Sequence, residues 1–199
     1  MKREHDQFSP LQRVLHWLMA AMVLAMLFIG VAMVSTLKPR FLTLIAIHKP
    51  LGIAILVLVV LRLGARWRYG APALPADLPA IHAIGAKLSH VALYGLLIAM
   101  PLIGWGMLSA GGYPIVLWGS IHLPPILPHD DQLHAILRTA HTVLAYLFFA
   151  TILLHLAAAL FHALIRRDGV FYAMAGFGRN CAGGEPLENL SVGQVNKTE

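Results

Sequence analysis

The sequence predicts an all-α membrane protein, a bundle of four transmembrane helices. Hydrophobic residues make up 58% of the 199 residues and charged residues only 12%, whereas about 25% of the residues in a soluble domain are charged. Four apolar runs are each long enough for the roughly 20 residues that an α-helix needs to cross a bilayer. The 15 lysines and arginines flank these runs, which indicates membrane topology and argues against a basic surface for nucleic acid.

The first predicted helix covers about residues 9–34. It begins at Ser9-Pro10, a capping residue followed by proline at the first helical position. Its apolar run, from Leu15 to Val34, is longer than the roughly 7–15 residues of a signal-peptide core, and no A-x-A cleavage signature follows it. We therefore expect this helix to stay in the membrane and the mature protein to be the whole chain.

The second helix, about 41–66, contains Pro50, which is tolerated in the first turns or at a kink that neighbouring helices satisfy. A linker rich in proline and alanine, residues 70–79, separates it from the third helix, about 84–109. The third helix contains Pro101 and several glycines, and small residues let helices approach closely. The loop 110–132 is predicted to form an interfacial hairpin or a short surface helix.

The fourth helix, about 133–166, is long enough to project beyond the hydrocarbon. Residues 1–177 then form a single membrane domain, and the tail 178–199, without apolar periodicity, is expected to be mobile. The side that carries both termini would hold eleven basic residues: Lys2, Arg3, Arg13, Arg62, Arg66, Arg68, Lys87, Arg166, Arg167, Arg179 and Lys197. The other side would hold four: Lys38, Arg40, Lys49 and Arg138. This imbalance predicts that both termini are cytoplasmic.

Four of the 11 histidines lie in or beside the apolar spans and form two pairs. Ionisable groups inside a membrane are costly and are therefore candidates for function. His141 and His155, 14 residues apart in the fourth helix, lie roughly 21 Å apart along the axis on nearly the same face. By depth, His48 of the second helix matches His141 on the outer side. His16 of the first helix matches His155 on the cytoplasmic side.

Two histidine pairs on facing helices suit two haems b in the bundle core, because bis-histidine haem iron takes one imidazole on each side of the macrocycle. Zinc and copper sites instead gather three or four ligands around one point. The only cysteine is Cys181, and no Cys-x-x-Cys-His motif is present, so the haems would be non-covalent. One histidine alone would more often be an ordinary hydrogen-bonded residue. The joint match in depth and face favours ligation.

His162 is a rival ligand, because it lies seven residues beyond His155 on nearly the same face. Its distance from His141 is about 31 Å along the axis, the whole thickness of the hydrocarbon, which would leave the two haems at opposite surfaces. His162 and His90 are therefore candidates for a quinone or proton site, with an ordinary interfacial role as the alternative.

Three cations are candidates to pair with haem propionates: Arg62, Lys49 and Arg138. Their long side chains would also reach the interface without any cofactor, and this alternative stays open.

Short motifs accompany the histidines in every helix. They are Leu15-His16-Trp17, Ile47-His48 with Gly52-Ile53 and Val60-Leu61-Arg62-Leu63, Leu88-Ser89-His90 with Tyr94 and Met100-Pro101-Leu102-Ile103-Gly104, and His141 with Leu154-His155-Leu156-Ala157-Ala158-Ala159-Leu160. Together they resemble the bacterial cytochrome b561 family, which includes di-haem superoxide oxidases, over about Leu11 to Phe177.

The resemblance implies a multi-pass protein of the bacterial inner membrane with two haems b that exchanges electrons with ubiquinone. It implies a superoxide:quinone oxidoreductase, which oxidises superoxide at the periplasmic face and reduces quinone. Lys49, Lys38, Arg40 and Arg138 would then attract the superoxide anion. Two alternatives remain: a haem b electron-conducting subunit for another redox protein, and a haemless transporter whose histidines bind metal or protons.

Overall fold

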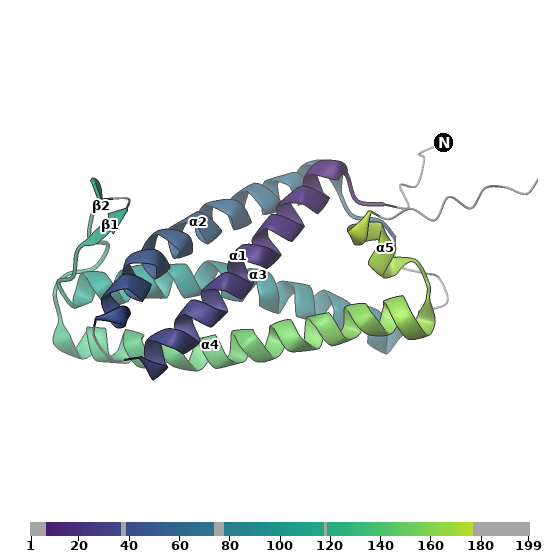
Figure 1. Cartoon of the computed structure of the whole chain (residues 1–199). Helices are drawn as coiled ribbons and strands as arrows, with labels where there is room; N and C mark the ends of the chain where they lie inside the picture. Colours follow the sequence, from purple (N-terminus) through teal and green to yellow (C-terminus); the bar gives the residue numbers. More distant parts are fainter. Residues whose placement is uncertain (1–6, 37–38, 74–77, 118, 177–199) are drawn as a thin grey trace, which may run out of the picture.

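A computed structural model describes residues 7–36, 39–73, 78–117 and 119–176. Four long helices run along one another (Figure 1): α1 (Pro10–Ser35), α2 (Arg40–Tyr69), α3 (Ala80–Ala110) and α4 (Asp131–Leu160). A π-helical segment, η1 (Phe161–Arg166), continues α4, and a short helix, α5 (Val170–Ala175), follows it. All four long helices are long and apolar enough to cross a membrane. The predicted four-helix membrane bundle is confirmed.

The helices α1 and α4 begin at side chains that cap their free backbone amides. The Gln12 amide donates to the Ser9 hydroxyl at 3.3 Å, and the Ser9 amide donates to the Gln12 side chain at 3.0 Å. This reciprocal capping box satisfies two amides that would otherwise lack a partner. In α4 the Leu133 amide donates to the Asp130 carboxylate at 2.9 Å, so the helix begins two residues earlier than predicted.

Other helix ends differ from the sequence-based bounds. The helix α2 continues to Tyr69 and ends where Gly70 takes a φ of 74°, because a helix can extend past its apolar run until a residue leaves helical geometry. The helix α3 begins at Ala80, directly after Pro79, and not at residue 84. The predicted fourth helix changes to π-helical geometry at Phe161, and Arg167, with a φ of 54°, ends it.

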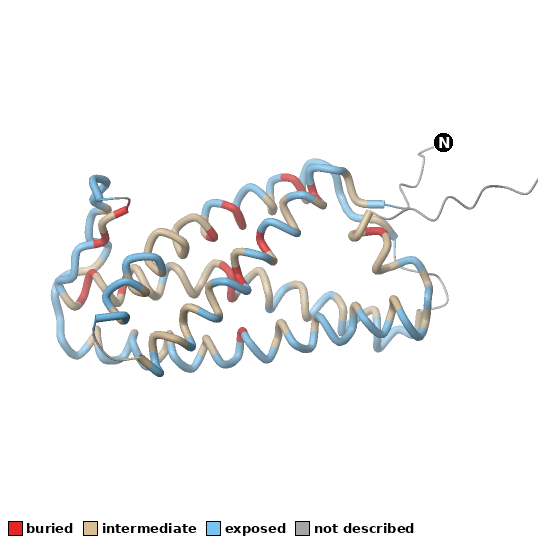
Figure 2. The backbone as a smooth tube through the Cα atoms, in the orientation of Figure 1, coloured by how far each residue is buried: buried red, intermediate tan, exposed pale blue. Residues whose placement is uncertain are grey.

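The bundle core is a cluster of buried apolar side chains from all four helices. Its members are Met19 and Val23 of α1, Ile55, Leu58 and Val59 of α2, Leu96 and Leu97 of α3, and Phe148 of α4. Most of the remaining helix surface is exposed (Figure 2) and apolar, including Phe28 at 75% and Trp67 at 92% exposure. A soluble protein rarely exposes so much continuous apolar surface, whereas lipid tails accommodate it.

A β-hairpin joins α3 to α4 at the end of the bundle opposite α5 (Figure 1). Strands β1 (Ile115–Leu117) and β2 (Ile121–Leu123) pair antiparallel, with Ile115 opposite Leu123. The Lys49 ammonium donates to the Pro114 carbonyl at 3.1 Å and ties the hairpin to α2. Of the two forms predicted for this loop, the structure has the hairpin.

The helix α5 lies against the beginning of α1. The Phe8 amide donates to the Ala173 carbonyl at 3.1 Å, and the Trp17 indole donates to the Met174 carbonyl at 3.3 Å. Residues 178–199, predicted to be a mobile tail, lie outside the described residues.

Candidate functional site

Two pairs of histidines lie in the bundle, one pair toward each end, and in each pair the two rings come from different helices and lie next to each other. His16 of α1 and His155 of α4 have ring centres 6.5 Å apart and planes at 62°. His48 of α2 and His141 of α4 have ring centres 6.2 Å apart and planes at 65°. We call them the α5-end pair and the hairpin-end pair. These are the same pairings that depth along the helices predicted.

The ring spacing has the length that a shared metal atom would give. A metal lies about 2.0 Å from a ligating imidazole nitrogen, and that nitrogen lies about 1.1 Å from its ring centre. Two imidazoles on opposite sides of one metal therefore have centres about 6.2 Å apart. Both observed spacings lie close to this value. The residues thus fit two haems, each held between two histidines.

The hydrogen bonding of these histidines points the same way. The buried Nδ1 atoms of His16, His48 and His141 have no hydrogen-bond partner. For His141, the Met100 carbonyl is a neighbouring acceptor, but no hydrogen bond to it has acceptable geometry. An unmet buried polar group costs about 1–3 kcal/mol, so such groups commonly mark places where a ligand or water supplies the missing interaction.

Five other histidines bond through Nδ1 to an oxygen of the protein. Their partners are Ala86 for His90, Ser120 for His122, Ala110 for His129, Met107 for His134 and Asp168 for His162. Within the described part of the chain, no three side chains of His, Cys, Asp or Glu converge on one point as a metal cluster.

The helix α3 supports both α4 histidines from the same side. The His90 ring lies edge-on to the His155 ring, with centres 5.6 Å apart and planes at 73°. At the other end, Gly104 lies against His141, and a Cβ atom placed on Gly104 would be 3.3 Å from Cε1 of that imidazole. His155 therefore packs against another imidazole, whereas His141 packs against a residue without a side chain.

Arg62 lies beside the α5-end pair. Its guanidinium is 5.6 Å from the centre of the Tyr94 ring and donates to the Met19 sulfur at 3.7 Å. It lines a small pocket with Phe8, Gln12, Arg66, His90, Tyr94 and Met174. No carboxylate pairs with Arg62 among the described residues. This half-buried cation is free to interact with an anionic group.

The two other predicted cations lie at the hairpin end. Lys49 follows His48 directly and already donates to the Pro114 carbonyl. Arg138 is exposed and lies one turn of α4 before His141. Both are close in sequence to a histidine of the hairpin-end pair.

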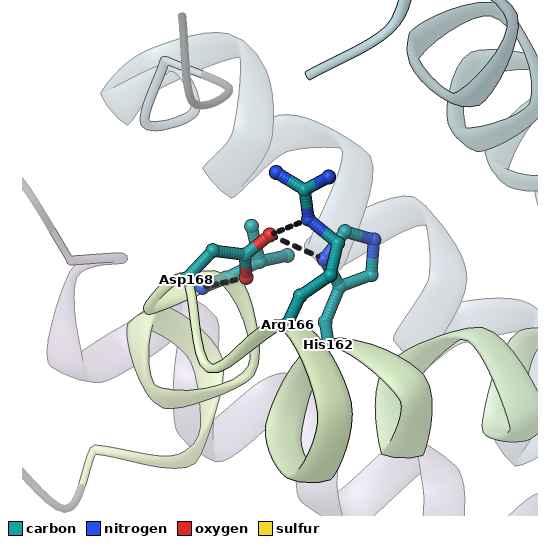
Figure 3. Close-up of polar contacts among 4 residues, drawn as sticks. His162, Arg166 and Asp168 are labelled. Carbon is teal, nitrogen blue, oxygen red and sulfur yellow. Dashed lines mark hydrogen bonds and ion pairs between the residues drawn. The ribbon is translucent and has the colours of Figure 1, made fainter. Parts of the chain in front are cut away.

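His162 belongs to a different group of residues. Its Nδ1 donates to the Asp168 carboxylate at 2.7 Å, and Arg166 Nε donates to the same oxygen at 2.9 Å (Figure 3). Burial by itself raises the pKa of Asp168, but the hydrogen bonds from His162, Arg166 and the Val170 amide outweigh that effect and hold its pKa below the ordinary value. The cluster fixes the turn between η1 and α5. Asp168 had no place in the sequence analysis, because only the turn brings it back to His162.

The chain matches known proteins over most of its length. The family model of prokaryotic cytochrome b561 matches residues 7–177. The chain is 32% identical over 179 residues to the "probable superoxide oxidase CybB" of Yersinia pestis, which covers 85% of this chain and 96% of that protein. It is 27% identical over 177 residues to "cytochrome b561 homolog 1" of Escherichia coli K12, covering 85% and 97%. It is 28% identical over 176 residues to "cytochrome b561 homolog 2" of the same strain, covering 86% and 92%.

The resemblance predicted from the motifs is confirmed by the family model, which includes all four helices and both histidine pairs within its range. The family binds haem b and transfers electrons. The chain therefore belongs to the prokaryotic cytochrome b561 family and is a multi-pass protein of the bacterial inner membrane.

Proposed function

We propose that this chain carries two haems b, one between His16 and His155 and one between His48 and His141. The spacing of the ring centres, 6.5 and 6.2 Å, is the observation that carries the proposal, because a shared iron atom gives about 6.2 Å. When bound, the haems supply the one-electron chemistry. The protein supplies the ligands, the orientation and the apolar surroundings.

The helix α4 gives one ligand to each site, and the rigid helical rise fixes their separation at roughly 21 Å. The two partners come from α1 and α2, which pack on each other. At the α5 end, Arg62 is placed to pair with a propionate, because it is half-buried and no carboxylate of the described residues faces it. Lys49 and Arg138 are the corresponding cations at the hairpin end.

We further propose that electrons enter from superoxide and leave to ubiquinone. Each superoxide anion loses one electron and becomes oxygen, and a quinone gains two electrons and two protons to form the quinol. A relative at 32% identity bears the name "probable superoxide oxidase CybB", which supports this donor. The exposed cations Arg40 and Arg138 at the hairpin end would attract an anion there by positive potential.

Of the two histidines considered for quinone or proton chemistry, His90 is the stronger candidate. It lines the pocket beside the α5-end pair, and its Nδ1–H donates to the Ala86 carbonyl, which leaves Nε2 as an acceptor. His162 lies in η1, and its Nδ1 already donates to the Asp168 carboxylate.

A pyridine haemochrome assay on the purified protein tests the cofactor proposal. About two haems b per chain are expected. His16→Ala and His48→Ala should each remove one, whereas His122→Ala, which changes an exposed hairpin histidine, should remove none. A full haem content in His16→Ala and His48→Ala would overturn the ligand assignment.

Stopped-flow mixing with superoxide and a quinone analogue tests the activity separately. Reduction of the haems by superoxide, followed by their oxidation by quinone, is the expected result. Two haems per chain without reaction with superoxide would leave an electron-conducting subunit for another redox protein as the function.

A further inference from the structure

The buried core of the bundle lies between the two histidine pairs. On α1 the buried residue Val23 is seven positions beyond His16, and on α2 the buried residue Ile55 is seven positions beyond His48. Seven residues are about two helical turns, so each lies on the face of its histidine and roughly 10 Å along the axis. The cluster that contains Val23 and Ile55 therefore separates the two sites.

On α4 the same spacing occurs twice. Phe148 is seven residues beyond His141 and seven residues before His155, so all three share one face of the helix, with Phe148 midway. It is the one buried residue of α4, with 8% of its surface exposed. It is also the only aromatic side chain among the buried members of the cluster in the described part of the chain.

The register between α3 and α4 places this ring in the packed interior. His90 contacts His155 at one end, and Gly104 contacts His141 at the other. Leu97 is seven residues from both His90 and Gly104. In this antiparallel register Leu97 lies opposite Phe148, and both belong to the same buried cluster. The path from one histidine pair to the other along α3 and α4 therefore passes through Phe148.

We propose that Phe148 is the bridging residue through which the two haem sites exchange electrons. This inference rests on the proposed two-haem function. With haem held by both histidine pairs, one electron would pass between them, so that one site would be oxidised and the other reduced; no bond would form or break, and no proton would move. Electron tunnelling slows exponentially with distance through the intervening medium. A conjugated, closely packed ring at the midpoint is a better medium than an aliphatic side chain or a void.

The test compares two substitutions of the same kind on adjacent residues. Phe148→Leu removes the bridging ring but keeps the site apolar. Phe149→Leu is the matched control, because Phe149 is 47% exposed and is not a member of the buried cluster. A photosensitiser reduces one haem in a laser flash, and the optical bands of the two haems then follow the transfer between them. Haem content and the two reduction potentials are measured in each variant.

In Phe148→Leu the inter-haem rate should fall several-fold, with two haems retained and both potentials unchanged. In Phe149→Leu the rate should match the unmodified protein. Equal rates in the two variants would overturn the proposal and leave Phe148 as apolar filling only. If Phe148→Leu loses a haem, Phe148→Met, whose longer and more flexible apolar side chain fills the site differently, provides the same comparison. An unmodified protein that lacks two haems would refute the proposed function, and the bridging role with it. Two haems with equal rates in the two variants would refute the bridging role alone.

Discussion

Replacing Gly104 with alanine tests how closely α3 supports the hairpin-end pair. The added Cβ atom would lie 3.3 Å from Cε1 and 3.6 Å from Nδ1 of His141. The first distance is shorter than an ordinary contact, so the imidazole or the helix must move by a few tenths of an ångström. A suitable control is Gly95→Ala in the same helix, because a Cβ atom there meets nothing within 4 Å.

The two variants share one favourable effect and differ in one unfavourable effect. Glycine inside a helix is about 0.5–1 kcal/mol less favourable than alanine, so both variants gain this amount. Overpacking typically costs about 1–3 kcal/mol, and only Gly104→Ala incurs it. The difference between them should therefore be about 1–3 kcal/mol. If this overpacking cost falls on the hairpin-end site, haem binding there weakens by roughly tenfold for each 1.4 kcal/mol.

Transfer of haem to an excess of apomyoglobin measures this effect. In Gly104→Ala one of the two haems should leave faster, and the other should leave at the rate of the unmodified protein. In Gly95→Ala both rates should stay unchanged. Identical haem release from Gly104→Ala and Gly95→Ala would refute the close packing of Gly104 on His141.

Three further predictions concern charged residues. Neutralising Lys49 and Arg138 together should slow haem reduction by superoxide by about tenfold at low salt and weaken the salt dependence of this rate. Stopped-flow measurements test this. Lys87→Gln, a change at the other end of the bundle, should have little effect. Arg62→Gln should lower the reduction potential of the α5-end haem alone, because a nearby cation favours the reduced form. Spectroelectrochemical titration measures both potentials, and an equal shift of the two would contradict this prediction. Asp168→Asn should loosen α5 by about 1 kcal/mol, seen as faster amide hydrogen exchange in residues 170–175. Because its folded pKa is lowered, the contribution of Asp168 should be present above the ordinary carboxyl pKa near 3.9 and be lost as the pH falls through the lower folded value.

The sequence predicted those features that depend on regular helical geometry. Four apolar runs sufficed for the four spans, and the constant rise and turn per residue sufficed to match His48 with His141 and His16 with His155. The contacts that support these rings depend on the register of one helix against another. Neither His90 beside His155 nor Gly104 beside His141 could be assigned before α3 and α4 were placed together.

The segment after α4 was predicted poorly for a related reason. Six residues are too few for the hydrophobic pattern to distinguish a π-helix from an α-helix. The sequence therefore predicted residues 161–166 as a continuation of the α-helix. Here the Asp168 carboxylate reaches back to His162 and Arg166, and Arg167 in left-handed geometry ends the helix. The helix α5 has only six residues, which is too short for a periodic pattern. Its position depends on contacts with Phe8 and Trp17 from the other end of the chain.

The two proposed haem sites share the helix α4 but differ in the charged residues that lie near them. This difference bears on the direction of electron flow. At the α5 end, Arg62 is half-buried and lines a pocket with His90, so water and salt screen its charge only weakly. At the hairpin end, Arg138 is exposed, and Lys49 is tied to the Pro114 carbonyl. A weakly screened cation stabilises an added electron more than an exposed one does. The α5-end site should therefore have the higher reduction potential, and electrons that enter near the hairpin should pass by Phe148 toward the end of the bundle where His90 and its pocket lie.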